Sequence, residues 1–383
     1  MQTYKLTAIC HFGTEALTKR EIYDLGYDID SVTDGRVTFV GDAEAIARAN
    51  INLRTADRVM IRIGSFEALT FDELFEKVKA LPWEEYIPRD GAFPVTKANA
   101  INSKLFSSSD IQSIVKKAIV SRLSSIYGIT WFEESGASYP VRIFINKNIV
   151  DVSIDTTGTS LHKRGYRPQV GKAPISESLA AALIMLSPWR GDRILVDPFC
   201  GSGTIPIEAA MMAAHIAPGV GRDFTASAWA NMIDKRIWTD SRTEALELED
   251  TSIETDIQGY DISDEAIRIA RENARRAGVE GLIHFQTRDV RQLSHPKKYG
   301  FIITNPPYGE RLSDSDELVE IYRALGEGYR GLDSWSMYII TSYEDAQRYI
   351  GRTADKNRKI YNGMIKTYFY EYRGAKPPKR RHD

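Results

Sequence analysis

The chain has 383 residues, which is too long for one ordinary hydrophobic core, so its length predicts two or three domains. Hydrophobic residues make up 43% of it and charged residues 27%, both near the average for a folded soluble protein, and no apolar run approaches the roughly 18 residues of a membrane span. The net charge of −2 argues against uniform coating of nucleic acid but leaves room for local basic patches.

The N-terminus has no signal-peptide pattern, and the two cysteines, Cys10 and Cys200, lie far apart in the sequence. This pattern supports neither a disulfide framework nor a cysteine zinc site, and no metal site is predicted. A cytoplasmic location is therefore expected.

Residues 4–63 follow a β-α-β-β-α-β rhythm, which is typical of a small ferredoxin-like fold. Asp34-Gly35 is a hairpin signal between its two middle strands. The spacing of apolar residues predicts strands and helices over residues 4–10, 15–25, 32–40, 43–53 and 58–63.

A second α+β unit follows, with two basic clusters. Residues 96–122 hold five basic residues against one acid, and residues 142–172 hold six against two. Such clusters, with Tyr166 interleaved, suit phosphates, but either cluster alone is more often an ordinary solvated face. The elements expected here are helices at 71–81 and 111–124, the latter after a possible serine cap at 107–110, a strand at 93–98, and a hairpin of 141–145 with 149–154.

Residues 158–171 are polar and glycine-punctuated, which predicts a linker, and the character changes from Ala173. Helix 177–186 is strongly apolar. An apolar strand from Arg193 then enters the turn Asp197-Pro-Phe-Cys-Gly-Ser-Gly-Thr204, behind which helix 205–214 begins. Glycines in such a turn let the backbone approach a ligand closely, but Pro206 stands where the third glycine of nicotinamide enzymes belongs.

Two acids follow at the ends of later strands. Asp261 ends a strand at 258–262 and suits the two hydroxyls of a ribose, while Asp289 follows a strand at 283–286 and suits an adenine amino group. Each alone is more often a loop residue or a helix cap; in order after the glycine-rich turn they indicate a nucleoside site. Residues 215–250 form an insertion, whose Trp229 and Trp238 are expected to pack it onto the domain.

Residues 301–304 predict a buried parallel strand that ends in Asn305-Pro306-Pro307-Tyr308. The two prolines make a rigid corner with few donors at the carboxyl end of the strand, where open α/β sheets bind ligands. An asparagine oxygen and a proline carbonyl suit the hydrogens of an exocyclic amine, and Tyr308 offers a face for stacking a base. The alternative is a plain proline turn with an exposed tyrosine, and this motif alone does not decide between the two.

The remaining pattern predicts a helix around 318–325, a strand at 337–341, a hairpin at 359–370 that turns on Asn362-Gly363, and a basic tail at 376–381.

These motifs resemble the class I S-adenosylmethionine-dependent methyltransferases that modify amino nitrogens. The second α+β unit is similar to the RNA-binding THUMP domain. The combination looks like the bacterial THUMP-containing 23S rRNA guanine-N2 methyltransferases, a group also labelled N6-adenine-specific DNA methylases. The resemblance implies an α/β fold with a Rossmann-like methyltransferase domain at 173–383, preceded by a ferredoxin-like subdomain at 1–65, a THUMP-like domain at 66–160 and a linker at 161–172.

The resemblance also implies roles for individual residues. The turn would lie against the methionine part of S-adenosylmethionine, Asp261 would bind its ribose, and Asp289 its adenine. The residues expected to bind the cofactor are Ser176, Asp197, Phe199, Gly201, Gly203, Thr204, Asp261, Ile262, Asp289 and Val290; those expected to act on the amine are Asn305, Pro306, Pro307 and Tyr308. The residues expected to contact RNA phosphates are Lys97, Lys116, Lys117, Lys163, Arg164 and Arg167.

Three functions then compete: a guanine-N2 methyltransferase acting on 23S rRNA or its precursor particle, an adenine-N6 methyltransferase acting on DNA or RNA, and a non-enzymatic RNA-binding protein that keeps the fold. The intact Asn305–Tyr308 corner and cofactor motifs speak against the third, and the N-terminal unit favours RNA over DNA. Guanine over adenine rests on the resemblance alone, and the sequence leaves the target nucleotide, protein partners and oligomeric state open.

Overall fold

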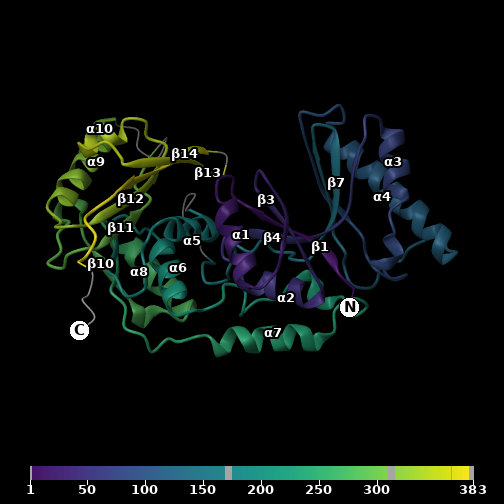
Figure 1. Ribbon diagram of the computed structural model, residues 1–383, viewed down its shortest axis with the longest axis horizontal. Helices are drawn as coiled ribbons and strands as arrows, with labels where there is room; N and C mark the ends of the chain where they lie inside the picture. The colour runs from purple at the N-terminus through teal and green to yellow at the C-terminus, as the bar shows by residue number, and fades with distance from the viewer. Residues whose placement is uncertain (1, 169–174, 309–314, 364, 379–383) are drawn as a thin grey trace. The chain divides into compact units, whose positions relative to one another are not determined.

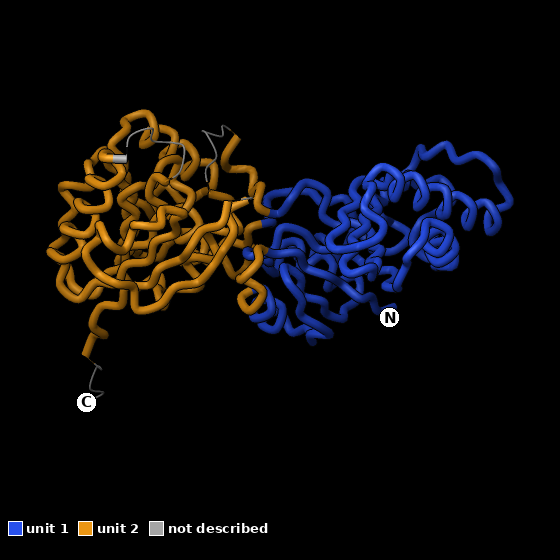
Figure 2. The backbone as a smooth tube through the Cα atoms, turned by 90° about the horizontal axis from the view of Figure 1, so that it is seen from above, with its two compact units in different colours: residues 1–10, 18–161, 219–245 blue, residues 11–17, 162–218, 246–383 orange. Residues whose placement is uncertain are grey.

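The computed structural model describes residues 2–168, 175–308, 315–363 and 365–378 (Figure 1). They divide into two compact units (Figure 2). The first contains residues 1–10, 18–161 and 219–245, and the second contains 11–17, 162–218 and 246–383. Over the described residues, no helix combines the length and the apolar character that a membrane crossing requires.

The first unit is built on one seven-stranded sheet with the order β2-β3-β1-β4-β7-β6-β5. The predicted ferredoxin-like rhythm is confirmed as β1-α1-β2-β3-α2-β4, and β4 pairs on its other side with β7, so the second α+β unit continues the same sheet. The strands are β1 (Tyr4–Cys10), β2 (Ile29–Thr33), β3 (Arg36–Gly41), β4 (Ala56–Glu67), β5 (Val95–Ile101), β6 (Val141–Asn146) and β7 (Ile149–Asp155).

Two helices of the first unit begin at polar caps that the sequence supplies, whereas Ser107 at the start of α4 makes no side-chain capping hydrogen bond. The side chains of Asp42 and Thr70 accept hydrogen bonds from backbone N–H groups of α2 and α3, which satisfies donors left over in the first turn. The last helix ends at Gly128 in the left-handed conformation that glycine favours. The helices are α1 (Glu15–Asp24), α2 (Ala43–Asn52), α3 (Phe71–Lys79) and α4 (Ser108–Tyr127), with the short 3-10 helix η1 (Trp83–Glu85).

The insertion after α6 belongs mainly to the first unit, because residues 219–245 cluster with it. The ring of Trp229 stacks on Tyr139 with centroids 4.8 Å apart, and its indole donates to the Ser138 carbonyl. The expectation that the insertion packs onto the methyltransferase domain is therefore wrong for this tryptophan: its partners lie just before β6. The insertion contains η2 (Thr225–Ala228) and α7 (Lys235–Glu247).

The second unit holds a seven-stranded sheet with the order β10-β9-β8-β11-β12-β14-β13. The first five strands are parallel, and β14 and β13 close the sheet in antiparallel pairing. The strands are β8 (Leu195–Asp197), β9 (Ile257–Asp261), β10 (Ile283–Thr287), β11 (Phe301–Thr304), β12 (Ser336–Thr341), β13 (Lys356–Asn362) and β14 (Ile365–Tyr372).

Helices cover both faces of this sheet, with α9 and α10 on one side and α5, α6 and α8 on the other (Figure 1). Tyr322 and Leu325 of α9 are fully buried against Ile302 and Ile339 of the sheet, which explains why these strands read as continuous apolar runs. The helices are α5 (Glu177–Leu186), α6 (Thr204–Ala213), α8 (Asp264–Arg276), α9 (Ser315–Arg330) and α10 (Ala346–Ile350), with the 3-10 helices η3 (Glu280–Leu282) and η4 (Val290–Gln292).

The predicted linker differs from the structure over its described part. Leu161 and Tyr166 are 1% and 3% exposed, and Arg164 is buried as well. Three side chains that a polar loop would leave in solvent are thus part of the packed protein. Residues 169–172 of the predicted linker and 379–381 of the basic tail lie outside the described residues.

Candidate active site

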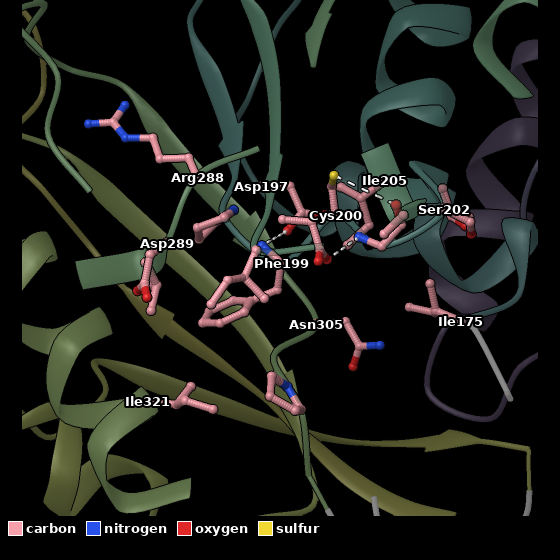
Figure 3. Close-up of a pocket in the computed structure, with 18 of the residues that line it drawn as sticks. Ile175, Asp197, Phe199, Cys200, Ser202, Ile205, Arg288, Asp289, Asn305 and Ile321 are labelled. Atoms are coloured by element: carbon pink, nitrogen blue, oxygen red, sulfur yellow. Dashed lines mark hydrogen bonds between the residues drawn. The ribbon is translucent and has the colours of Figure 1, made fainter. Parts of the chain in front are cut away.

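The carboxyl ends of four neighbouring parallel strands bring the predicted polar residues to one edge of the second sheet. Asp261 closes β9, Asp197 closes β8, Asp289 follows β10, and Asn305 follows β11. A cavity of about 480 Å³ opens there, and all four side chains line it (Figure 3). The crevice beyond the carboxyl strand ends is where doubly wound sheets bind ligands.

The glycine-rich turn forms one wall of this cavity and needs both of its glycines. Gly201 and Gly203 have φ angles of +52° and +84°, in the left-handed region that L side chains rarely adopt. A Cβ atom on Gly203 would also lie 3.0 Å from side-chain atoms of Ala270 and Phe285. The turn is tied to the next strand, because Asp261 accepts hydrogen bonds from the N–H groups of Gly201 (3.0 Å) and Ser263 (2.9 Å).

Asp197 is buried beneath this turn and accepts hydrogen bonds from the Phe199 N–H and the Thr304 hydroxyl. Burial, with a smaller contribution from the nearby Asp261 carboxylate, outweighs the two hydrogen bonds and raises the pKa of Asp197 from 3.8 to about 7. At neutral pH this carboxyl group is therefore partly protonated.

The opposite wall combines polar and apolar groups. Asp289 caps η4 by accepting from the Arg291 N–H (2.8 Å), and its other oxygen lies 3.0 Å from the Arg291 guanidinium. Ile262 lines the cavity although its side chain is 71% exposed. An exposed apolar side chain beside acids at strand ends suits a ligand with a flat apolar ring and polar substituents.

The Asn305 corner supplies the most informative atom of the site. Within the described part of the chain, the Asn305 Oδ1 atom is buried and has no hydrogen-bond partner. Buried polar oxygens almost always have a partner, so this acceptor is available for a donor that enters the cavity. The corner is braced from behind, because the Tyr322 hydroxyl lies 3.3 Å from the Pro307 carbonyl oxygen and 2.6 Å from the Thr341 hydroxyl.

Tyr308 differs from its predicted exposure. It is only 3% exposed, and its hydroxyl accepts a hydrogen bond from the Asn362 amide (2.9 Å) at the end of β13. Its ring is therefore buried and offers no free face for stacking in this arrangement. A base could use that face only after the side chain leaves its present contacts.

Two further predicted cofactor residues lie apart from the cavity wall. The Ser176 hydroxyl caps α5 by accepting from the Leu179 N–H (3.3 Å), and it lies 3.1 Å from the His11 imidazole, whereas its neighbour Ile175 lines the cavity. Gly203 is not among the lining residues either, and its lack of a Cβ atom allows Ala270 and Phe285 to pack closely against it. Pro306 and Tyr308 are likewise not among the lining residues, although Asn305 and Pro307 are.

Sequence reasoning missed the residues that reach the cavity from loops and helices beyond the motifs. Arg288 and Arg291 flank Asp289, so proximity to that acid was an available signal. Glu317 and Ile321 come from α9, and only the packing of that helix places them there. The missed lining residues are Ile175, Ile205, Ala266, Ile269, Arg288, Arg291, Glu317 and Ile321, while Pro198, Cys200 and Ser202 belong to the turn Asp197–Thr204 that the resemblance places against the cofactor.

The predicted phosphate contacts differ in their exposure. Lys97, Lys117 and Lys163 are exposed, which suits phosphate binding. Lys116 forms an ion pair with Glu134 and lies over the Phe93 ring.

Arg164 and Arg167 differ from their prediction, because their side chains are only 1% and 8% exposed and pair with Glu208 and Glu177. Burial against acids of α5 and α6 removes both from any surface on which a phosphate could land.

The shifted pKa of Asp197 predicts a pH-dependent stability. The folded state holds this proton up to about pH 7 and the unfolded state only to about 3.8, so the stabilisation is complete below about pH 4 and is lost as the pH rises through 7. We expect Asp197→Asn to remove up to about 4 kcal/mol of this dependence. Urea unfolding of the ligand-free protein across this range measures it. Asp345→Asn, at an exposed position, controls for the lost charge; equal pH profiles for wild type and Asp197→Asn would contradict the assignment.

The fold and the site together define a class: a Rossmann-like domain with a cavity at the carboxyl edge of its sheet, lined by acids at strand ends and by Asn305 and Pro307 of the proline corner, which is the arrangement of class I methyltransferases. Residues 164–371 match the family described as "RMKL-like, methyltransferase domain", residues 5–60 match "RlmL ferredoxin-like domain", and residues 68–155 match "THUMP domain". The chain belongs to the RMKL-like methyltransferase family.

Two curated relatives show how far the similarity extends. "Putative RNA methyltransferase YpsC" from Bacillus subtilis (strain 168) is 45% identical over 383 residues, which covers 100% of this chain and 99% of that protein. "Ribosomal RNA large subunit methyltransferase K/L" from Marinomonas sp. (strain MWYL1) is 31% identical over 381 residues, which covers 97% of this chain. The chain spans only 53% of the latter's length.

A solved structure has the same fold over the whole chain. "SMU.472, a putative methyltransferase complexed with SAH" is 42% identical, has a TM-score of 0.91, and covers 99% of this chain and 100% of its own. The ferredoxin-like, THUMP and methyltransferase parts predicted from the sequence are therefore confirmed as a fold, while the exact domain boundaries stay predictions.

Proposed function

We propose that this protein is an S-adenosylmethionine-dependent RNA methyltransferase that modifies an exocyclic base amine, with guanine N2 of 23S rRNA as the favoured target. The observation that carries the proposal is the Asn305 Oδ1 atom, which is buried in the cavity and has no hydrogen-bond partner among the residues that the structure describes. An amine N–H is the donor that such an acceptor fits. The relatives described above add support, since their names refer to RNA and to large-subunit ribosomal RNA.

The cavity fits the methyl donor by its chemistry. Asp261 still has lone pairs free after accepting two backbone hydrogen bonds, and these suit the ribose hydroxyls. Ile262 and Val290 provide apolar surface for an adenine ring, and Asp289 an acceptor for its amino group. When bound, S-adenosylmethionine supplies an electrophilic methyl group on a positively charged sulfur.

An exocyclic base amine is a poor nucleophile, because its lone pair is delocalised into the ring. The Asn305 corner can increase that nucleophilicity. Hydrogen bonds accepted by the Asn305 Oδ1 atom and the Pro306 carbonyl pull the amine towards tetrahedral geometry, which frees the lone pair for the methyl group. The new N–C bond forms as the S–C bond breaks, the positive charge passes to nitrogen, and the acidic ammonium loses a proton to water. Positioning therefore supplies most of the rate acceleration.

The THUMP part is proposed to recruit RNA through its exposed basic residues, with Lys97 and Lys117 as candidate phosphate contacts. A catalytic fragment starting near Lys172 is a poor test of this role. Such a fragment lacks Arg164 and Tyr166, which pack on the buried Glu208 of α6, so it would lose part of its own core.

Mass mapping of modified nucleosides in rRNA from a deletion strain tests the proposal. We expect one N2-methylguanosine in 23S rRNA to disappear and to return on complementation with the wild-type chain but not with Asn305→Ala. Loss of an N6-methyladenosine would transfer the assignment to the adenine-N6 reaction. Unchanged modification of rRNA would contradict the proposed ribosomal target.

A further inference from the structure

One face of the β13–β14 hairpin carries an alternation of lysines and tyrosines. In the register of this pair Lys359 lies opposite Tyr368, and Tyr361 lies opposite Lys366. Because side chains alternate between the two faces of a strand, these four residues share one face, here called the hairpin face. It presents two cations and two aromatic rings in a chequered arrangement.

Each lysine of the hairpin face lies over a ring of the same face. The Lys359 Nζ atom is 5.0 Å from the Tyr361 centroid, and the Lys366 Nζ atom is 5.1 Å from the Tyr368 centroid. Phe12, which is 42% exposed, meets Tyr361 edge to face with centroids 6.0 Å apart. The rings are thus held by cations and by each other, while both lysines are exposed.

The hairpin face lies beside the Asn305 corner. Register places Thr304 opposite Ile339 on β12, Thr341 of β12 opposite Tyr368, and Tyr368 opposite Lys359. Neighbouring strands are about 4.8 Å apart, so the hairpin face begins roughly 10 Å from β11 across the sheet. The hydrogen bond from Asn362 to the Tyr308 hydroxyl ties the hairpin directly to the corner.

Lysines on the edge strand β13 have an ordinary explanation, because charged residues protect sheet edges from pairing with other chains. That explanation covers both lysines, because β12 pairs with β14 only between Tyr368 and Tyr372 and leaves Lys366 beyond its end, but it does not account for the partly exposed aromatic rings beside them. Lys366 also keeps its charge, because its hydrogen bond with Tyr368, with smaller contributions from Tyr361 and Glu344, raises its pKa.

We propose that the hairpin face binds the unpaired nucleotides next to the target base. The inference rests on the proposed RNA methyltransferase function and adds a site to it. Aromatic faces hold unpaired bases by stacking, and lysines between them neutralise the phosphates that link those bases. Enzymes that modify a base either act on single-stranded substrate or extrude the target base from its helix, and a target in a single-stranded stretch brings unpaired neighbours to the hairpin face.

The test measures RNA binding by the full chain, without any methyl donor. The probe is a fluorescent, unstructured RNA oligonucleotide of about 10 nucleotides. We expect Tyr361→Ala to weaken binding roughly tenfold and Tyr361→Phe to retain it, because phenylalanine keeps the stacking face. The double variant Lys359→Gln/Lys366→Gln should flatten the slope of log affinity against log salt by roughly 1.4. Binding then neutralises two fewer phosphates, and each phosphate of a single strand contributes about 0.7 to the slope through counterion release.

A matched control exists on α1, where the Lys19 Nζ atom lies 5.5 Å from the Tyr23 centroid. Lys19→Gln/Tyr23→Ala should leave affinity and salt slope unchanged. Photo-crosslinking of a 4-thiouridine version of the probe to the wild type adds a readout that needs no variant, and the crosslinked peptide should contain Tyr361 or Tyr368.

Three results would each overturn the proposal. The hairpin variants could bind the RNA as the wild type does, the α1 variant could lose as much affinity as they do, or the crosslinks could all lie in the first unit. Failure of this proposal can be told apart from failure of the proposed function. Nucleoside mapping tests methyl transfer, whereas the oligonucleotide assay tests RNA binding alone.

Discussion

Replacing Asn305 with alanine is expected to abolish most methyl transfer while cofactor binding stays near that of the wild type. The Asn305 Oδ1 atom is buried and, among the described residues, has no partner, so the variant removes an acceptor without breaking a hydrogen bond of the protein. Its bond to the amine strengthens as the nitrogen becomes tetrahedral, so the loss falls on the transition state. Removing one such preorganised group typically costs about 100- to 1000-fold in rate.

Single-turnover transfer to RNA and calorimetric binding of S-adenosylmethionine measure the two effects separately. Asn305→Asp keeps an acceptor in the same place and adds a charge that favours the ammonium product, so we expect it to retain more activity than alanine. Asn357→Ala, an exposed asparagine of β13, is the matched substitution and should behave as the wild type. Near-normal turnover by Asn305→Ala would mean that the corner shapes the cavity without acting on the amine.

The residues found from sequence are those with a purely local signal. Asp197, Asp261, Asp289 and Asn305 each stand at or just after the carboxyl end of a strand, and the short stretch of residues that predicts each strand lies directly before them. Their convergence then follows from a general rule, because parallel neighbours place their carboxyl ends at one edge. The glycine-rich turn is local in the same sense, since positive φ angles at Gly201 and Gly203 reflect their own lack of a side chain.

The features that could not be predicted from the sequence depend on contacts between residues that lie far apart in the chain. The Tyr308 hydroxyl accepts a hydrogen bond from Asn362, 54 positions away, and Trp229 stacks on a tyrosine 90 positions before it. Glu317 and Ile321 reach the cavity only because α9 packs on the sheet. No local pattern encodes such pairings, so an exposed and a buried aromatic residue look alike in the sequence.

Arg164 shows the same limit for charge. It stands in a basic run, Lys163-Arg164, where a solvated face or a phosphate contact is the natural expectation. The structure places only Lys163 at the surface, and it turns Arg164 inward to Glu208, 44 positions away. The charge count of a segment is therefore a poor guide to which of its cations a ligand can reach.

Arg164→Ala is in turn expected to destabilise the methyltransferase domain by about 3–5 kcal/mol, the usual cost of removing one partner of a buried ion pair. The Arg164 and Glu208 side chains are 1% and 0% exposed, and their closest atoms, Nε and Oε1, lie 3.4 Å apart. Tyr166 donates to the same oxygen (3.1 Å), and within the described ranges the second oxygen of Glu208 has no hydrogen-bond partner. Without Arg164, Glu208 would be left as a buried carboxylate with one neutral hydrogen bond.

Urea unfolding followed by the tryptophan signal measures this loss, and Arg275→Ala provides the matched control. Arg275 pairs with Glu272 on α8, but its side chain is 61% exposed, so its removal should change stability by less than about 0.5 kcal/mol. The double variant Arg164→Met/Glu208→Gln should recover much of the stability lost by Arg164→Ala, because it removes the stranded charge as well as the cation. If Arg164→Ala were no more destabilising than Arg275→Ala, Glu208 would have to be neutralised by other means, and the segment around Arg164 would not be held to α6 by charge.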